Sequence, residues 1–164
     1  DAAVISRFGT LRGAENVHTA PYPGLATDAA PLLAAVMLCA QGESSLQDRV
    51  FENRFVCAEG FAALGANVWV AERTLYVQPG GALHGARLTA PDLRGGAALV
   101  LAALAARGSS RLGGTALVRR GYADLDRLLA GLGAQIWQEI PARSGLAKKT
   151  PTKKQFCLAI GAKK

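Results

Sequence analysis

The stretch LGANVW at residues 64–69 decides the fold, because it returns 68 residues later as LGAQIW at residues 132–137. Ahead of each copy, other landmarks recur in the same order. An Asp, an apolar run and a Gly occupy residues 28–42 and again residues 92–108. A sequence that repeats at about 65 to 70 residues consists of copies of one structural unit.

Each copy has the pattern of a small α/β unit. Asp28 and Gly42 bound the first apolar run, and Asp92 and Gly108 bound the second, as an N-cap and a C-terminal glycine bound a helix. In the first copy we expect helices near 29–41 and 58–64 and strands near 45–48, 67–70 and 74–78. In the second we expect helices near 93–107 and 122–132 and strands near 111–118 and 135–138.

Strand pairs that carry helices on one face predict a layered α+β domain. The chain has 164 residues, of which 50% are hydrophobic and only 6% aromatic, and it contains 19 glycines. A chain of this size and hydrophobicity buries a core of its own. Because the apolar runs are rich in Ala and Leu, we expect the helices to pack closely beneath the sheets.

The charge divides the chain in two. All twelve acidic residues lie within residues 1–139, where twelve arginines balance them and no lysine occurs. Residues 140–164 hold Arg143 and all six lysines, and therefore the whole net charge of +7. We expect a domain over 1–139, with repeats at about 17–80 and 81–139, and a basic tail over 140–164. A neutral body makes nucleic acid an unlikely partner.

The apolar run at 95–106 is too short for a bilayer, which needs about 20 residues. No membrane association or secretory signal is expected. Cys39, Cys57 and Cys157 form no CxxC pair and are interpreted as reduced thiols of a cytoplasmic protein. Cys39 and Cys57 are expected to be packed helix residues, although the start of a helix could also lower the pKa of Cys57.

Standard site motifs are absent from the sequence, including a phosphate-binding GxxxxGKS loop, HExxH and GxSxG. We expect neither a metal nor a cofactor, since His18 and His84 have no acidic or cysteine neighbours at ligand spacing. Arg54, Arg94 and Arg120 lie at junctions between expected elements. They could clamp a carboxylate or phosphate, or they could form ion pairs between repeats, for example with Glu52 or Asp92.

The segments TAPYPGLATD at 19–28 and FENRF at 51–55 closely resemble UDP-N-acetylglucosamine enolpyruvyl transferases. So do the DLR, LVLA and RGY segments at 92–94, 99–102 and 120–122. The resemblance covers residues 17–139 and argues against the sister shikimate-pathway enzymes. It implies an inside-out α/β barrel domain of βαβαββ-like units, with helices inside and sheets outside.

The resemblance also implies a reaction of peptidoglycan synthesis, hence of cell shape and division. The sugar 3-hydroxyl of UDP-N-acetylglucosamine attacks C2 of phosphoenolpyruvate, and the adduct then loses phosphate. By this resemblance Asp28 is the general base beside that hydroxyl. The substrate-binding positions that it implies are Val50, Arg54, Asp92, Leu93, Arg94 and Arg120.

The sequence departs from the family pattern in groups that the reaction needs. The family's second domain supplies a Lys-Asn pair and a loop with a reactive Cys, which the sequence does not match. We therefore expect the chain alone to be inactive, and a complementary domain or chain remains a possible partner. A non-catalytic nucleotide-sugar-binding or assembly module is the alternative function.

The basic tail has three interpretations: a solvated appendage, an anchor for anionic partners, or a strand within residues 155–164. The last rests on QFCLAIGAKK, which faintly resembles the family's first strand, with Lys163 in place of the phosphoenolpyruvate lysine.

Overall fold

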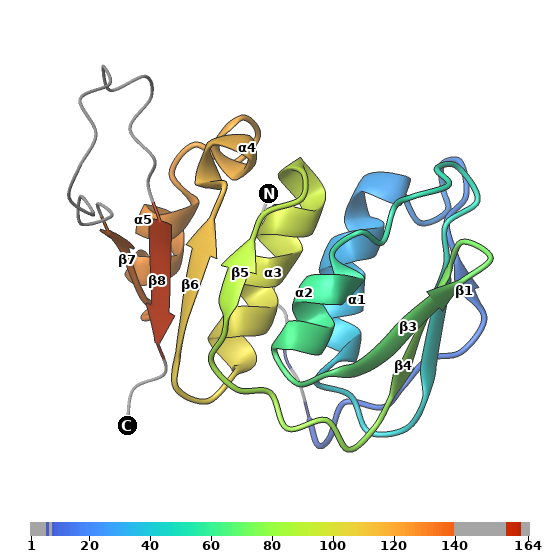
Figure 1. The fold of residues 1–164 in the computed structure, drawn as a ribbon. Coiled ribbons are helices and arrows are strands. Elements are labelled where there is room, and N and C mark those ends of the chain that lie inside the picture. Colours follow the sequence, from blue (N-terminus) through green and yellow to red (C-terminus); the bar gives the residue numbers. More distant parts are fainter. Residues whose placement is uncertain (1–5, 7, 140–156, 162–164) are drawn as a thin grey trace.

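Two four-stranded sheets enclose the helices of this protein (Figure 1). The computed structural model describes residue 6, residues 8–139 and residues 157–161. The first unit runs through β1 (Val17–His18), the 3-10 helix η1 (Thr27–Ala29), α1 (Ala30–Met37), β2 (Ser44–Gln47), α2 (Ala58–Ala63), β3 (Asn67–Ala71) and β4 (Thr74–Gln78). The second runs through β5 (Arg87–Thr89), α3 (Leu93–Ala105), β6 (Ser109–Gly113), α4 (Thr115–Arg119), α5 (Leu125–Gly131), β7 (Gln135–Glu139) and β8 (Cys157–Gly161).

The two sheets have the same topology. Their strand orders are β1-β2-β4-β3 and β5-β6-β8-β7. In each, the first two strands are parallel, and the third strand in the order runs antiparallel to both of its neighbours. The repeat detected in the sequence is therefore a repeat of structure, and each unit has the expected βαβαββ-like form.

β8 lies in the segment that the charge pattern assigned to a basic tail. It pairs with β6 and β7 in the place that β4 takes between β2 and β3. Trp137 faces residue 159 across this ladder as Trp69 faces Tyr76. The second sheet thus extends beyond residue 139, which corrects the interpretation of 140–164 as wholly separate from the domain. A strand within 155–164 is confirmed, while Lys163 lies outside the described residues.

The helices pack against one another between the sheets, as the Ala-rich composition predicted. α1 and α3 run side by side in the same direction (Figure 1). Both helices carry small side chains, and Ala34 of α1 and Ala98 of α3 are fully buried. Phe61 and Leu64 fill the space beneath the first sheet and are also fully buried. Burying such a side chain stabilises the fold by about 1.5 to 3 kcal/mol.

The strand expected at 111–118 is wrong in its second half. β6 ends at Gly113, and Thr115–Arg119 forms the helix α4. Gly114 has φ of +69°, a left-handed conformation that breaks the strand and begins the helix. Val118 then turns inward and is buried in the contact of α4 with α3. Sequence periodicity alone could not separate this short apolar helix from a strand.

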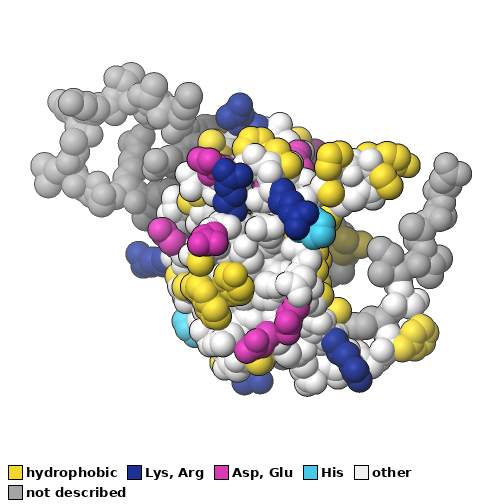
Figure 2. All heavy atoms as spheres, turned by 90° about the vertical axis from the view of Figure 1, so that its right-hand side faces the viewer, with side chains coloured by type: hydrophobic (Ala, Val, Ile, Leu, Met, Phe, Trp, Pro, Cys, Tyr) yellow, Lys and Arg dark blue, Asp and Glu magenta, His cyan; other side chains and the backbone are white. Residues whose placement is uncertain are grey.

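The face of the molecule in Figure 2 carries basic and acidic side chains interspersed, with hydrophobic side chains between them. This agrees with the balance of charge over residues 1–139. No helix of the described residues is long and apolar enough to cross a membrane.

Two glycines on helices give a matched test of the packing. A Cβ at Gly96 would lie 2.5 Å from Val118 Cγ2 and 2.8 Å from Ala90 Cβ, whereas a Cβ at Gly131 meets nothing within 4 Å. We expect Gly96→Ala to lower the free energy of unfolding by about 1 to 3 kcal/mol through overpacking. Gly131→Ala should raise it by about 0.5 to 1 kcal/mol because Gly is a poor helix former. Urea denaturation measures both, and equal effects would contradict the close approach of α3 and α4.

Candidate functional site

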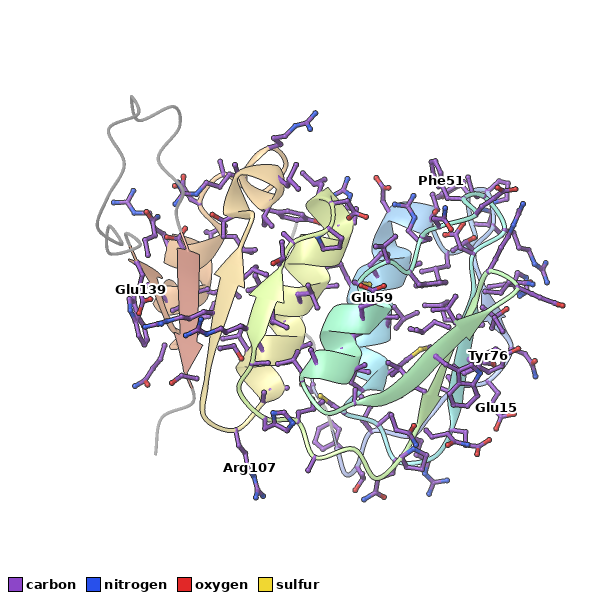
Figure 3. All side chains as sticks on the ribbon, viewed as in Figure 1. Glu15, Phe51, Glu59, Tyr76, Arg107 and Glu139 are labelled. Carbon is purple, nitrogen blue, oxygen red and sulfur yellow. The ribbon has the colours of Figure 1, made fainter. Side chains whose placement is uncertain are left out.

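Asp28 and Arg94, two of the expected site residues, lie where α1 and α3 begin, and these helix ends are at the upper end of the molecule in Figure 1. Because the two helices are parallel, the positive ends of their dipoles lie at the same end of the fold. Figure 3 labels Phe51 at this end, where its side chain points away from the helices. The segments that meet here come from both repeat units.

Asp28 bridges the two units through its carboxylate. Arg94 of the second unit donates a hydrogen bond to Asp28 Oδ2 at 2.8 Å, and Arg54 Nη2 lies 3.5 Å from Asp28 Oδ1. The Asp28 side chain is 55% exposed, so a ligand in solution can reach it. Asp28 was expected to cap α1, but it lies within η1 and forms no such cap. Its carboxylate is therefore available for the arginines.

Arg54 is the more enclosed of the two arginines, with a side chain only 12% exposed. Its Nε donates a hydrogen bond to Thr27 Oγ1 at 3.0 Å, and its guanidinium lies over the Phe51 ring, 4.3 Å from the centroid. These contacts, with that to Asp28, fix the plane of the guanidinium. A guanidinium held in this way can present paired donors to a carboxylate or phosphate.

Arg94 is held by Tyr122. Its Nη1 donates to the Tyr122 hydroxyl at 2.8 Å, and the guanidinium lies 5.5 Å from the centre of that ring. The hydrogen bond to Tyr122 raises the pKa of Arg94, and the contact with Asp28 raises it further. Arg94 therefore stays positively charged whenever the protein is folded. The ion pair expected between repeats is present, with Asp28 in place of Asp92 as the acid.

Asp92 and Leu93 have structural contacts in this structure. Asp92 caps α3 as expected, because its Oδ1 accepts a hydrogen bond from the Gly95 N–H at 2.6 Å. Leu93 packs against Gly121, where an added Cβ would lie 2.9 Å from Leu93 Cδ1. The DLR and RGY segments thus touch directly. Glu52, the other expected ion-pair acid, binds Arg73 instead of Arg54.

Val50 and Arg120 lie outside the contact of Asp28 with the two arginines. Val50 is 54% exposed in the turn that precedes Arg54. Arg120 is exposed directly after α4, and within the described residues the hydrogen bonds and ion pairs of Asp28, Arg54 and Arg94 involve other partners. The structure therefore brings three of the seven expected residues into direct contact.

Two residues of the cluster were missed by the sequence interpretation. Asp48 is fully buried, and its Oδ2 accepts a hydrogen bond from the Thr27 hydroxyl at 2.5 Å. Asp48 belongs to none of the quoted motifs, and Thr27 was quoted only as part of TAPYPGLATD, with no role of its own. An Asp at the end of an expected strand, shortly before FENRF, was the available signal.

A separate surface hollow of about 430 Å³ lies between α2 and β3 and includes Phe55, Val68 and Trp69 in its lining. Glu52 and Glu59 belong to the same hollow, whereas Asp28, Arg54 and Arg94 do not. It therefore has acidic groups and lacks the arginines that an anionic ligand needs.

The cluster as a whole joins an exposed carboxylate to two fixed guanidinium groups. The carboxylate can accept a hydrogen bond from, or a proton of, a ligand hydroxyl. The guanidinium groups can stabilise negative charge on the same ligand or on a second one. Within the described residues, no group of three or more His, Cys, Asp or Glu side chains is placed to hold a metal ion.

The family model of EPSP synthase (3-phosphoshikimate 1-carboxyvinyltransferase) matches residues 2–129. The chain belongs to the EPSP synthase family. An enolpyruvyl transferase structure, NikO from Streptomyces tendae, is 37% identical with a TM-score of 0.67, over 74% of this chain and 28% of that one. An EPSP synthase structure from Acinetobacter baumannii, 15% identical with a TM-score of 0.56 over 84% of this chain and 29% of that one, shares the fold. The expected inside-out barrel architecture is thereby confirmed.

Within the EPSP synthase family, relatives named UDP-N-acetylglucosamine 1-carboxyvinyltransferase match most of the chain. One from Caulobacter sp. (strain K31) is 39% identical over 83% of this chain, and one from Mesorhizobium japonicum is 41% identical over 81%. The matched region covers 32% of each relative, so the chain spans about a third of their length. The resemblance stated from the sequence is confirmed.

The two described cysteines, Cys39 and Cys57, differ in exposure. Cys57 is buried as expected, and burial, helped by the negative charge of Asp92, raises its pKa to about 12. Cys39 is exposed, which corrects its assignment to the core. The alternative of a lowered pKa for Cys57 is wrong.

At pH 8 we therefore expect iodoacetamide to modify Cys39 while Cys57 stays unmodified in the folded protein. In urea both thiols should react, which serves as the control. Peptide mapping by mass spectrometry measures the extent at each site. Modification of Cys57 at the rate of Cys39 under native conditions would contradict the burial of its thiol.

Proposed function

We propose that this chain is a portion of a UDP-N-acetylglucosamine 1-carboxyvinyltransferase that contributes the general base and three arginines to the substrate site. The bridge between Asp28 and Arg54 and Arg94 carries the proposal, because it joins an accessible carboxylate to fixed cations. The names of the relatives support the substrate class.

In this reaction the 3-hydroxyl oxygen of the sugar forms a bond to C2 of phosphoenolpyruvate, and C3 of phosphoenolpyruvate gains a proton. The resulting adduct then loses inorganic phosphate and a proton from C3, which leaves the enolpyruvyl ether. Asp28 would accept the hydroxyl proton as the oxygen attacks. Arg54, Arg94 and Arg120 would stabilise the carboxylate and phosphate charges, and do so most strongly in the adduct.

The remaining assignments follow from the same proposal. Val50 and the DLR segment, Asp92 to Arg94, would contact the ligand around this centre. The activity would belong to cytoplasmic peptidoglycan synthesis, and so to cell shape and division. A complementary domain or chain would complete the site, since the chain spans about a third of its relatives.

The alternative is a binding or assembly module without catalysis, which the same exposed carboxylate and fixed guanidinium groups would serve. Such a module would retain Asp28 and the arginines for nucleotide-sugar contacts only. Such a module would bind UDP-N-acetylglucosamine as the transferase site would. Unlike the transferase, it would show no turnover when the complementary domain or chain is supplied.

Isothermal titration calorimetry with UDP-N-acetylglucosamine tests the proposed half-site. We expect the wild-type chain to bind, and Asp28→Asn to weaken binding by about 10-fold or more, since a hydrogen bond to a charged group is worth about 1.5 to 3 kcal/mol. Asp126→Asn is the matched control, because Asp126 accepts a hydrogen bond from Gln138 on the second sheet. This variant should bind UDP-N-acetylglucosamine with the affinity of the wild type. Equal affinity of wild type and Asp28→Asn would overturn the role of Asp28.

A coupled phosphate-release assay tests turnover. We expect the 164-residue chain alone, supplied with UDP-N-acetylglucosamine and phosphoenolpyruvate, to release no phosphate above background. The physical reason is that the isolated chain would lack the charge-stabilising groups that a complementary domain or chain supplies to the adduct. A full-length relative is the positive control, and phosphate release by the isolated chain would contradict the prediction.

A further inference from the structure

Asp48 is a buried carboxylate that the proposed chemistry does not use. It follows the last residue of β2, and its side chain is entirely inaccessible to solvent. A carboxylate in such a place is costly unless both oxygens are satisfied. Each of its two oxygens has a different set of partners.

One oxygen holds the turn that leads to Arg54. Asp48 Oδ1 accepts hydrogen bonds from the N–H groups of Val50, at 2.8 Å, and Phe51, at 2.7 Å. Such bonds from an Asp to the backbone just after it stabilise a turn. This turn leaves Val50 and Phe51 about half exposed, beside the guanidinium of Arg54.

The other oxygen faces the arginine side of the cluster. Asp48 Oδ2 accepts a hydrogen bond from the Thr27 hydroxyl and lies 3.6 Å from Arg54 Nε. Thr27 Oγ1 accepts in turn from Arg54 Nε at 3.0 Å. Thr27 immediately precedes Asp28, so this triangle ties the arginine to the backbone that carries the proposed base.

The second unit shows that the fold of the repeat does not require this carboxylate. Leu46 of β2 pairs with β1 as Leu112 of β6 pairs with β5. The residue two positions after Leu46 is Asp48, whereas the residue two positions after Leu112 is Gly114. The second unit makes the same strand pairing with no side chain at that place. The acid is thus a feature of the first unit's loops and not of the repeat.

We propose that Asp48 is a positioning residue, which sets Arg54, the Asp28 segment and the Val50 turn at a fixed geometry for one ligand. The proposal rests on the proposed nucleotide-sugar site. It assigns the two oxygens separate tasks: Oδ1 orients the turn that presents Val50, and Oδ2 orients Arg54 and Thr27.

Asp48→Asn tests this assignment because it keeps the shape and removes one acceptor. If the amide oxygen stays on the Val50 and Phe51 N–H groups, the NH₂ group faces Arg54 Nε and two donors oppose each other. If the amide flips, the NH₂ group opposes the two backbone donors instead. Either orientation loses contacts that the carboxylate makes.

The first readout is the arginine Nε–H region of a ¹H–¹⁵N NMR spectrum of the full chain. We expect a distinct, slowly exchanging Arg54 signal in the wild type, assigned by its loss in Arg54→Lys. In Asp48→Asn this signal should move to the position of exposed arginines or broaden. Glu52→Gln is the matched control, because it breaks an exposed arginine–carboxylate pair with Arg73 in the same loop and should leave the Arg54 signal unchanged.

The second readout is calorimetric titration with UDP-N-acetylglucosamine. We expect Asp48→Asn to weaken binding by about 10-fold and Glu52→Gln to have no effect. Thr27→Val should also weaken binding, and its effect should nearly vanish in the Asp48→Asn background because both act through Arg54. If Asp48→Asn does not fold, the shift of the Arg54 signal in Thr27→Val decides the proposal.

An unchanged Arg54 signal in Asp48→Asn, or in Thr27→Val if Asp48→Asn does not fold, overturns the positioning role. So does strict additivity of the two variants in binding. If the wild type fails to bind UDP-N-acetylglucosamine, the proposed function fails while the NMR experiment still decides whether Asp48 orients Arg54.

Discussion

The contact between α1 and α3 sets how closely the two repeat units meet. Ala34 of α1 and Ala98 of α3 are fully buried, and side chains of this size allow two helix backbones to approach. Because the helices are parallel, their first turns reach the same end of the molecule. Asp28 and Arg94, which are 66 residues apart in sequence, can therefore form an ion pair. A larger side chain between the helices would separate the two halves of the site.

Charge at that end is arranged around a few acids of different burial. Asp28 is exposed and shared between two arginines, while Asp48 is buried and satisfied by a hydroxyl and two backbone N–H groups. The exposed acid can exchange its partners for a ligand at small cost, because such ion pairs are weak in water. The buried acid cannot do so, since losing a partner would leave an unsatisfied charge. The exchangeable contacts and the fixed contacts thus belong to different carboxylates.

Local signals in the sequence succeeded where the physics is local. Asp92 caps α3, and Gly42 and Gly108 have a positive φ, because these features depend on neighbours within a few residues. The glycines do not end the helices as expected, since α1 ends at Met37 and α3 at Ala105. The same logic failed for Asp28, whose partners come from distant segments, and for Thr115–Arg119, where burial against α3 selects a helix. Charge composition placed a boundary at residue 139, but strand pairing carries the second sheet on to β8.

The sequence by itself determined the repeat, the alternation of strands and helices, the family and the arginines worth examining. These properties follow from the spacing and type of residues. They can be recognised without knowing which distant residues are in contact. Only the tertiary structure decided which residues meet. It joined Asp28 to Arg54 and Arg94, left Arg120 outside that contact, and placed Asp48 beneath it. The reason is that side-chain partners are chosen by the packing of α1 on α3 and the turn after β2, and one sequence shows neither directly.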